Sequence, residues 1–320
     1  MKLATINDGT ADGRLYVVSR DLTRAEPAGG VQTMQALMED WNGLSAPLKA
    51  QYAALNAGQG DSFDPSTALA PLPRAWQWLD GSAYDSHGDL MPNVFKLAPT
   101  PKGRPLMYQG MSHQFLAPTA DVPLPTEDDG IDFEGEFGVI CDAVPMGTSA
   151  AEARSHIRLI VQINDWSLRT VAPIEMKTGF GWIQAKPACS VAPIAVTPDE
   201  LGGAWRDARV DLPLKVILNG TIFGKAEGYH MSYGFDDLIA HAARTRQLVA
   251  GTVLGSGTVS NENFREIGSS CIAERRGIEI LDIGAPETPY MAFGDSVEME
   301  CTLRDGTPLF GKIVQRVVKF

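Results

Sequence analysis

One ten-residue stretch constrains the fold more than any other part of the chain. Residues 131–140 read Ile-Asp-Phe-Glu-Gly-Glu-Phe-Gly-Val-Ile, so that apolar and acidic side chains alternate. Successive side chains of a β-strand point to opposite faces. The pattern therefore predicts a strand with its aromatic and aliphatic residues toward a core and with Asp132, Glu134 and Glu136 together on the other face.

The three acidic residues of this strand favour a bound cation. Carboxylates two residues apart on a strand lie roughly 7 Å from each other, and they raise each other's pKa unless a positive charge lies between them. A hard divalent cation with oxygen ligands removes that repulsion. The first alternative is a solvated strand face, which is common in antiparallel sheets. The second is a Ca²⁺ site that serves structure alone.

Two other segments supply further ligands or bases. Asp165 follows the apolar run 160–163, and Arg169 comes four residues later. Asp80 and His87 lie at the two ends of the segment 80–87. The alternatives are an Asn-Asp turn for the first segment and a structural histidine for the second.

Two features could contact an anionic group. Lys186 is the only charged residue between positions 178 and 196. The Gly-Ser-Gly-Thr-Val-Ser stretch at 255–260 could present backbone N–H groups to an anion, although a plain turn also explains it.

The remaining pattern predicts a chain that is mostly β with some α. Residues 1–30 alternate as short strands, residues 31–57 have helical spacing, and residues 58–74 are typical of a linker. We expect a small amino-terminal α/β domain over residues 1–68 and a mixed β-sandwich roll over residues 69–320.

Local motifs in the larger region refine this prediction. Asn219-Gly220 and Asp305-Gly306 each join two strand-like runs. Ser149 begins a capping box, from which we expect a helix to about residue 163, and residues 235–248 predict a second helix.

Composition excludes several functions. The chain has 27 Lys and Arg against 39 Asp and Glu, a formal charge of −12, so nucleic acid and anionic membranes are not expected partners. The four cysteines are dispersed, which argues against a cysteine zinc site. No nucleophile elbow, dinucleotide fingerprint, P-loop or His-Glu-x-x-His motif occurs. The first residues lack a signal-peptide pattern, and no apolar run has membrane-spanning length, so we expect a cytoplasmic protein.

Four short motifs in this order resemble the fumarylacetoacetate hydrolase family. They are Glu134-Gly135-Glu136, Asn164-Asp165-Trp166-Ser167, Gly257-Thr258-Val259-Ser260 and Gly294-Asp295-Ser296-Val297. The resemblance covers most of residues 70–320 and implies a small amino-terminal domain followed by a larger β-roll that carries the site.

The resemblance also implies roles for individual residues. Glu134, Glu136 and Asp165, joined by Asp80, would bind Mg²⁺ or Ca²⁺. Catalysis would involve His87 with Glu274 as its carboxylate partner, Lys186 as a donor to an oxyanion and Arg169 as a contact for a carboxylate arm. Tyr108 and Thr258 would contact substrate.

The function that the resemblance implies is hydrolysis of a C–C bond in a 1,3-diketo acid. We expect fumarylacetoacetate as the substrate, cleaved to fumarate and acetoacetate in tyrosine catabolism, and a homodimer. The alternatives are an acylpyruvate or fumarylpyruvate hydrolase and a metal-dependent 2-oxo-acid hydratase or decarboxylase. Substrate identity is the open point, because fumarylacetoacetases have Gln and Tyr where this chain has Ala172 and Met176, and no counterpart of their mobile-loop Arg is found.

Overall fold

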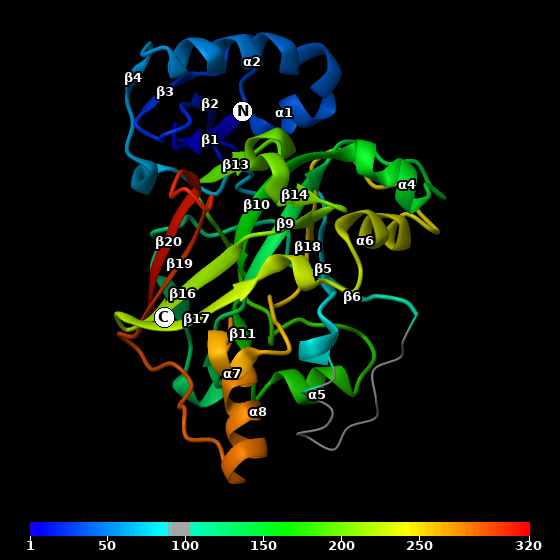
Figure 1. Ribbon diagram of the computed structural model, residues 1–320, viewed down its shortest axis with the longest axis vertical. Helices are drawn as coiled ribbons and strands as arrows, with labels where there is room; N and C mark the ends of the chain where they lie inside the picture. The colour runs from blue at the N-terminus through cyan, green and yellow to red at the C-terminus, as the bar shows by residue number, and fades with distance from the viewer. Residues whose placement is uncertain (89, 91–102) are drawn as a thin grey trace.

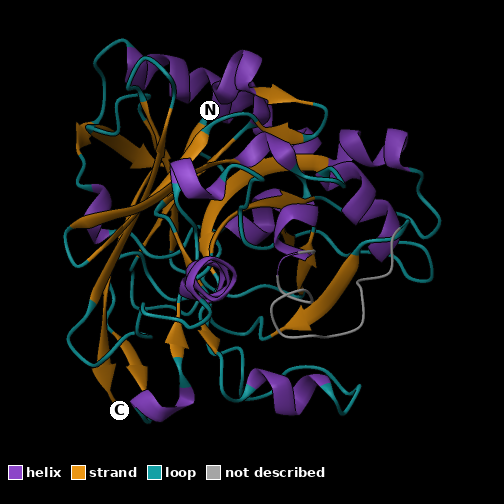
Figure 2. Ribbon diagram, turned by 60° about the horizontal axis from the view of Figure 1, so that its bottom comes forward, coloured by secondary structure: helices purple, strands orange, loops and turns teal. Residues whose placement is uncertain are grey.

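A computed structural model describes residues 1–88, 90 and 103–320, and within these ranges the chain forms two large β-sheets (Figures 1 and 2). The first sheet has the strand order β4 (Asp61–Ser62), β3 (Arg24–Pro27), β2 (Arg14–Val18), β1 (Lys2–Ile6), β13 (Ile194–Val196), β10 (Ile157–Asn164), β9 (Gly135–Cys141), β18 (Thr252–Gly255), β5 (Trp78–Ser82) and β6 (Leu106–Gly110), with β12 (Ser190–Val191) also paired to β10. The second has the order β17 (Thr221–Glu227), β16 (Pro213–Leu218), β19 (Ser296–Thr302), β20 (Pro308–Lys319) and β7 (Val122–Leu124).

Both sheets are mixed, because β18 pairs with β5 and β20 with β7 in parallel while the other pairings are antiparallel. Two further strand pairs are small: β8 (Ile131–Asp132) with β11 (Ser167–Leu168), and β14 (Trp205–Arg206) with β15 (Arg209–Val210). The expected mostly-β fold with a mixed roll is confirmed.

The central strands are buried on both faces. Val139 belongs to a core shared with the second sheet, including Val216, whereas its neighbour Ile140 packs in a core shared with the amino-terminal helices, including Leu37. This alternation follows from the period of two along a strand. The central sheet is therefore the middle layer of the molecule.

The amino-terminal segment covers one end of this layer (Figure 1). The helical spacing of residues 31–57 is confirmed by α1 (Met34–Glu39) and α2 (Trp41–Asn56). Asp40 separates the helices, and its side chain accepts a hydrogen bond from Gly43 N at 3.2 Å, as an N-cap residue does. Strand β1 pairs with β13, so the amino-terminal strands extend the central sheet. The domain boundary at residue 68 stays a prediction.

The capping box at Ser149 is confirmed, but the helix expected to reach residue 163 is wrong. Helix α4 covers only Ala150–Ala153, a 3-10 turn covers Arg154–His156, and Ile157–Asn164 form strand β10. The β-branched residues of this segment pair with β9 in the centre of the sheet, and this pairing outweighs the helical start signal. The second expected helix is also shorter, because α6 covers Phe235–Ala242.

Both predicted turn motifs join paired strands, as expected. Asn219 and Gly220 have positive φ values of 49° and 77°, as a type I′ turn requires, and they join β16 to β17. Asp305-Gly306 lies between β19 and β20. Helices α5 (Ala172–Met176), α7 (Phe264–Ile267) and α8 (Ile272–Ile283) lie at the end of the molecule opposite the amino-terminal helices (Figure 1).

Candidate active site

Neighbouring strands of the central sheet bring the expected site residues together. Asp80 on β5 lies directly opposite Tyr108 on β6 and beside Gly255 on β18. Glu136 on β9 pairs with Ile163 of β10, two residues before Asp165. Residues paired across a sheet point to the same face, so the register brings the side chains of Tyr108, Asp80 and Glu136 to one face of the sheet from three strands.

Asp80 and Glu136 belong to a cluster of four carboxylates. Asp80, Glu134, Glu136 and Asp165 each have an oxygen within 4.8 Å of the others, and all four residues are buried. Neither carboxylate oxygen of Glu136 has a hydrogen-bond partner among the described residues. Burial and the neighbouring Asp80 and Asp165 charges raise the pKa of Glu136 well above its usual range.

These four side chains fit a hard divalent cation. Buried carboxylates without partners carry a large desolvation penalty, and oxygen-only ligand sets are those that Mg²⁺, Mn²⁺ and Ca²⁺ prefer. The backbone at Gly255 is part of this arrangement. A Cβ atom there would collide with Asp80 Oδ1 and come within 2.9 Å of Glu136 Oε2. Only glycine leaves both carboxylates their present positions.

Lys186 already lies among the carboxylates. Its Nζ atom is 2.6 Å from Asp165 Oδ2 and 3.0 Å from Glu134 Oε2. Burial alone would lower the pKa of Lys186, but the charges of Asp165 and Glu134 raise it above the ordinary value. Conversely, burial would raise the pKa of Glu134, but Lys186 and Arg169 hold it below the ordinary value. Lys186 is therefore an ammonium group.

Arg169 lies on the other side of Glu134. Its Nη2 atom is 2.7 Å from Glu134 Oε1, and its Nε atom donates to Asp132 Oδ2 at 2.7 Å. The guanidinium is thus engaged by two protein carboxylates. Its expected contact with a substrate carboxylate arm stays a prediction.

Asp132 is not part of the four-carboxylate cluster, and the single strand expected over residues 131–140 is wrong. The stretch 131–140 is broken, because β8 ends at Asp132 and β9 begins at Gly135. Asp132 instead accepts hydrogen bonds from Ile272 N at 2.7 Å and Ala273 N at 2.9 Å, at the start of α8. A carboxylate is stabilised there by the partial positive charge of a helix N-terminus.

Glu134, in the break between β8 and β9, is fixed by neighbours of Asp165. Its backbone N–H donates to Asn164 Oδ1 at 3.0 Å, and its carbonyl accepts from Asp165 N at 3.0 Å. The Ser167 hydroxyl donates to Glu134 Oε1 at 3.0 Å. The Asn-Asp-Trp-Ser motif therefore supplies one carboxylate of the cluster and holds another.

His87 and Glu274 come together from distant parts of the chain. His87 Nδ1 lies 4.0 Å from Glu274 Oε1, and Glu274 is in the first turn of α8. Burial lowers the pKa of His87 to about 4, so its imidazole is neutral at pH 7. Burial raises the pKa of Glu274 to about 7. The structure thus places the expected base beside its expected carboxylate partner.

Sequence reasoning missed two hydroxyls and a thiol at this pair. Ser260 Oγ donates to Glu274 Oε1, and Ser86 Oγ donates to Ser260 Oγ at 2.9 Å. Cys271, the N-cap of α8, has its sulfur within 4.8 Å of ligand atoms of His87 and Glu274. The Ser-x-x-Glu-like spacing of Cys271 and Glu274 is a helix-start signal that could have located Glu274.

The two expected substrate contacts differ in their surroundings. The Tyr108 hydroxyl donates to Asp165 Oδ2 at 2.6 Å, and the ring lies under Lys186 Nζ, 5.4 Å from the ring centre. Thr258 is buried in the loop after β18. In the same loop Gly257 N donates to Asp80 Oδ1 at 3.2 Å, so this N–H serves a protein carboxylate. Substrate contact by either residue stays a prediction.

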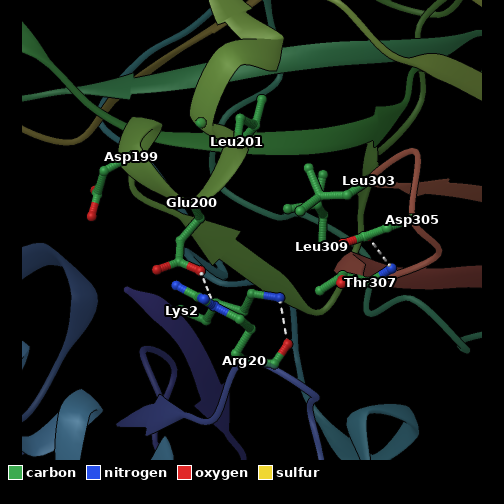
Figure 3. Close-up of a pocket in the computed structure, with 10 residues that line it drawn as sticks. Lys2, Arg20, Asp199, Glu200, Leu201, Leu303, Asp305, Thr307 and Leu309 are labelled. Atoms are coloured by element: carbon green, nitrogen blue, oxygen red, sulfur yellow. Dashed lines mark hydrogen bonds and ion pairs between the residues drawn. The ribbon is translucent and has the colours of Figure 1, made fainter.

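A separate cavity of about 260 Å³ lies away from this site, between the amino-terminal strands and the β19–β20 turn (Figure 3). Glu200 reaches its wall and pairs with Arg20 at 3.5 Å, and it also accepts from the Tyr52 hydroxyl at 2.7 Å. Lys2 Nζ donates to the carbonyl oxygen of Arg20 at 2.6 Å. The contacts of Glu200 join the amino-terminal segment to the rest of the molecule.

None of the described helices has both the length and the apolar character needed to cross a lipid bilayer.

Two relatives show which reactions similar chains perform. The chain is 28% identical over 157 residues to 2,4-didehydro-3-deoxy-L-rhamnonate hydrolase of Sphingomonas sp. (strain SKA58), covering 48% of this chain and 52% of the relative. It is 24% identical over 157 residues to the mitochondrial oxaloacetate tautomerase Fahd2a of Rattus norvegicus, covering 48% of each chain. The match thus spans about half the length of these curated relatives.

Solved structures show the same fold. Maleylpyruvate hydrolase from Sphingobium sp. SYK-6, in complex with manganese(II) ion and pyruvate, superposes with a TM-score of 0.67 at 18% identity over 100% of this chain and 99% of that one. The 5-carboxymethyl-2-hydroxymuconate delta-isomerase from Mycobacterium smegmatis gives a TM-score of 0.62 at 17% identity, with the same coverage.

Family descriptions account for nearly the whole chain. "Fumarylacetoacetate (FAA) hydrolase C-terminal" matches residues 77–318, the region that contains the carboxylate cluster, Lys186 and the His87–Glu274 pair. "Fumarylacetoacetase N-terminal domain 2" matches residues 1–74. The chain belongs to the fumarylacetoacetate hydrolase family, whose members include hydrolases, isomerases and tautomerases.

Proposed function

We propose that the protein is a divalent-cation-dependent hydrolase that cleaves a C–C bond in a 1,3-diketo acid. One observation carries the proposal. A neutral, partly buried histidine, His87, lies 4.0 Å from the carboxylate of Glu274 in the same site as the four-carboxylate cluster and Lys186. Hydrolysis needs a base that activates water, and a histidine–carboxylate pair can act as that base. Keto–enol tautomerisation, the other reaction considered below, does not need activated water.

The cation would be held by Asp80, Glu134, Glu136 and Asp165. When bound, it supplies positive charge that polarises the two oxygens of a 1,3-dicarbonyl group. We propose Mg²⁺ or Ca²⁺ for this position, and Mn²⁺ has the same preference for carboxylate oxygens.

His87 takes a proton from water, and Glu274 orients its ring and stabilises the imidazolium that results. The hydroxide attacks one carbonyl carbon, and that oxygen becomes an oxyanion. Lys186 carries three N–H groups, of which Asp165 and Glu134 accept two, so its ammonium can donate the third to this oxyanion.

The C–C bond then breaks when the tetrahedral oxyanion re-forms a carbonyl. The electron pair leaves on the adjacent carbon, where it is delocalised as an enolate, and His87 returns its proton to that carbon. One water is consumed, and a carboxylic acid and a ketone are formed. Arg169 would keep Glu134 oriented toward the cluster through its 2.7 Å contact.

The proposed substrate is fumarylacetoacetate, which would place the protein in tyrosine catabolism. An alternative substrate for the same hydrolysis is an acylpyruvate such as fumarylpyruvate. An alternative reaction is hydration or decarboxylation of a 2-oxo acid. The relatives named above include a hydrolase of a diketo sugar acid, which supports a diketo acid as the substrate class.

A second candidate function is keto–enol tautomerisation of a 2-oxo acid, and the oxaloacetate tautomerase relative favours it. Tautomerisation needs a base, a proton donor and a polarised carbonyl, which Lys186 and the carboxylate cluster could provide without His87. The two functions are therefore distinguished by whether water is consumed and whether His87 is required.

The experiment compares cation-loaded protein with chelator-treated protein on fumarylacetoacetate, fumarylpyruvate, acetylpyruvate and oxaloacetate. Loss of the enol absorption band is followed, and the acid products are identified by chromatography. Cation-dependent formation of two shorter products from a diketo acid supports hydrolysis. A change of the oxaloacetate enol band alone, with no cleavage of the three diketo acids, would overturn the proposal in favour of tautomerisation.

We also propose that the protein acts as a homodimer in the cytoplasm. Sedimentation velocity of the purified chain tests the dimer, and a monomer at micromolar concentration would contradict it.

A further inference from the structure

A second group of ligand-type side chains lies beside the four carboxylates. His87 Nδ1, Cys271 Sγ and a carboxylate oxygen of Glu274 all lie within 4.8 Å of one another. They come from the segment after β5 and from the first turn of α8. Cys271 and Glu274 have no exposed surface, and only 17% of the His87 side chain is exposed.

Two atoms of this group that could bind a metal have no hydrogen-bond partner among the residues that the structure describes. They are His87 Nδ1 and Glu274 Oε2, and both are buried. Leaving such atoms unpaired costs free energy, so the group is ready to accept a ligand that binds lone pairs. Cys271 Sγ accepts a hydrogen bond from Glu274 N at 3.3 Å, which fixes the thiol beside the carboxylate.

The donor set differs in kind from the first cluster. Carboxylate oxygens alone suit hard ions, whereas an imidazole nitrogen with a thiolate sulfur suits Zn²⁺ and similar borderline-soft ions. We propose that His87, Cys271 and Glu274 form a three-ligand site for Zn²⁺, separate from the carboxylate site for the hard cation.

The spacing is close to what such an ion needs. Zinc–ligand bonds of about 2.0–2.3 Å in a tetrahedron place the donor atoms roughly 3.4–3.8 Å apart. The observed separation of His87 Nδ1 and Glu274 Oε1 is 4.0 Å, and the three ligand atoms all lie within 4.8 Å of one another, so binding requires them to approach by up to about 1 Å. Three protein ligands leave the fourth tetrahedral position to water. Binding converts the Cys271 thiol to a thiolate and releases its proton to solvent.

Zinc at this site would inhibit the hydrolysis. This consequence rests on the proposed function, because it assumes that His87 and Glu274 activate water. An ion that takes Nδ1 of His87 and the carboxylate of Glu274 separates the base from its partner. Inhibition would therefore persist when the carboxylate site is saturated with Mg²⁺.

The test uses Co²⁺ as a spectroscopic substitute for Zn²⁺, in the full chain with saturating Mg²⁺. A cobalt–thiolate bond gives a charge-transfer absorption band that oxygen ligands do not give. The variant is Cys271→Ser, which keeps an N-cap acceptor for Glu274 N because serine is a preferred N-cap residue. The control is Cys189→Ser, since Cys189 is buried and its Sγ donates to Asn164 O next to the carboxylate cluster.

We expect the wild-type chain and Cys189→Ser to give the thiolate band at one equivalent of Co²⁺, and Zn²⁺ to abolish it by displacement. Cys271→Ser should lose the band and bind Zn²⁺ at least about 100-fold more weakly, since changing a residue that only orients a metal ligand already weakens binding about 10–100-fold. Absence of the band in wild type, or its retention in Cys271→Ser, would overturn the zinc site. These readouts involve no substrate, so they stand or fall independently of the proposed hydrolysis.

Discussion

His87 Nδ1 and Glu274 Oε1 lie 4.0 Å apart although 187 positions separate the two residues in the chain (274 − 87). The distance is longer than a hydrogen bond, as is common for acid–base pairs before substrate binds. We predict that His87→Ala lowers kcat for diketo-acid cleavage by about 10²–10⁴, the usual contribution of a general base. Steady-state assays with each diketo acid measure this effect.

The matched control is His113→Ala, because His113 is exposed. It should keep wild-type kcat and KM. Circular dichroism and thermal unfolding show whether His87→Ala is folded. Full turnover by a folded His87→Ala chain would contradict water activation by this residue.

Lys186 holds two carboxylates that would otherwise repel each other. Removal of one partner of a buried ion pair leaves an uncompensated charge and costs about 3–5 kcal/mol. We predict that Lys186→Ala loses about this much stability in urea unfolding without divalent cations and recovers much of it with saturating Mg²⁺, because the cation replaces the lost positive charge. Its activity should still fall by at least about 10², the cost of one oxyanion donor.

Lys177→Ala is the control for this experiment, since Lys177 is exposed on the same chain segment. It should change the free energy of unfolding by less than about 0.5 kcal/mol, with or without Mg²⁺. If Mg²⁺ stabilises Lys186→Ala no more than it stabilises wild type, the cation does not bind among these carboxylates.

The sequence predicted the chemistry of the site better than its geometry. Glu134 and Glu136 could be recognised because acids alone occupy one face of the predicted strand, and Asp165 because its Asn-Asp-Trp-Ser motif resembles that of the family. The structure brings the three together with Asp80. The break at Phe133 could not be predicted from alternation. It depends on pairing between Ser167 and Asp132 and on the contact of Glu134 with Cys271, both of which are non-local.

The same limit explains the error at Ser149. A capping box is a local signal, and α4 does begin at it. The residues that follow α4 pair with β9 as a strand instead of continuing the helix. Likewise the motif that contains Ser260 does not indicate what its hydroxyl contacts. Its hydroxyl meets Glu274 only because the loop after β18 packs against the first turn of α8.

Lys2 supplies a test of pH dependence outside the active site. Burial lowers the pKa of Lys2 to about 8, whereas its pKa in an unfolded chain is near the ordinary value of 10.5. Between these values the unfolded chain binds more protons than the folded chain, so stability rises with pH. We predict that wild type gains up to about 3 kcal/mol relative to Lys2→Met between pH 8 and 10.5, and less if solvent reaches the ammonium.

Below pH 8 the difference between these two chains should be constant, since Lys2 is then charged in both states. This difference in the free energy of unfolding also contains a loss in Lys2→Met that does not depend on pH, because the carbonyl oxygen of Arg20 loses its hydrogen-bond donor. Lys49→Met, at an exposed position, should run parallel to wild type at every pH. Urea unfolding at several pH values measures the three curves, and a flat difference for Lys2→Met would contradict the lowered pKa.

Gly255 gives the sharpest test of the cation site, because its backbone lies between two of the proposed ligands. A Cβ atom at this position would collide with Asp80 Oδ1 and crowd Glu136 Oε2, both of which must keep their positions to bind one ion. We predict that Gly255→Ala lowers the affinity for Mg²⁺ or Mn²⁺ by at least about 10-fold, measured by calorimetric titration.

An added methyl group in a packed core lowers the free energy of unfolding by about 1–3 kcal/mol by itself. The control variant must therefore add a methyl group to the core at a position away from the carboxylates. Gly138→Ala meets this need, because its Cβ would collide with Ile163 Cδ1 and approach Leu254 O to 3.1 Å. Both variants should unfold at lower urea concentration than wild type, but only Gly255→Ala should bind the cation more weakly. Equal cation affinity in the two variants would mean that Asp80 and Glu136 do not act as ligands of a common ion.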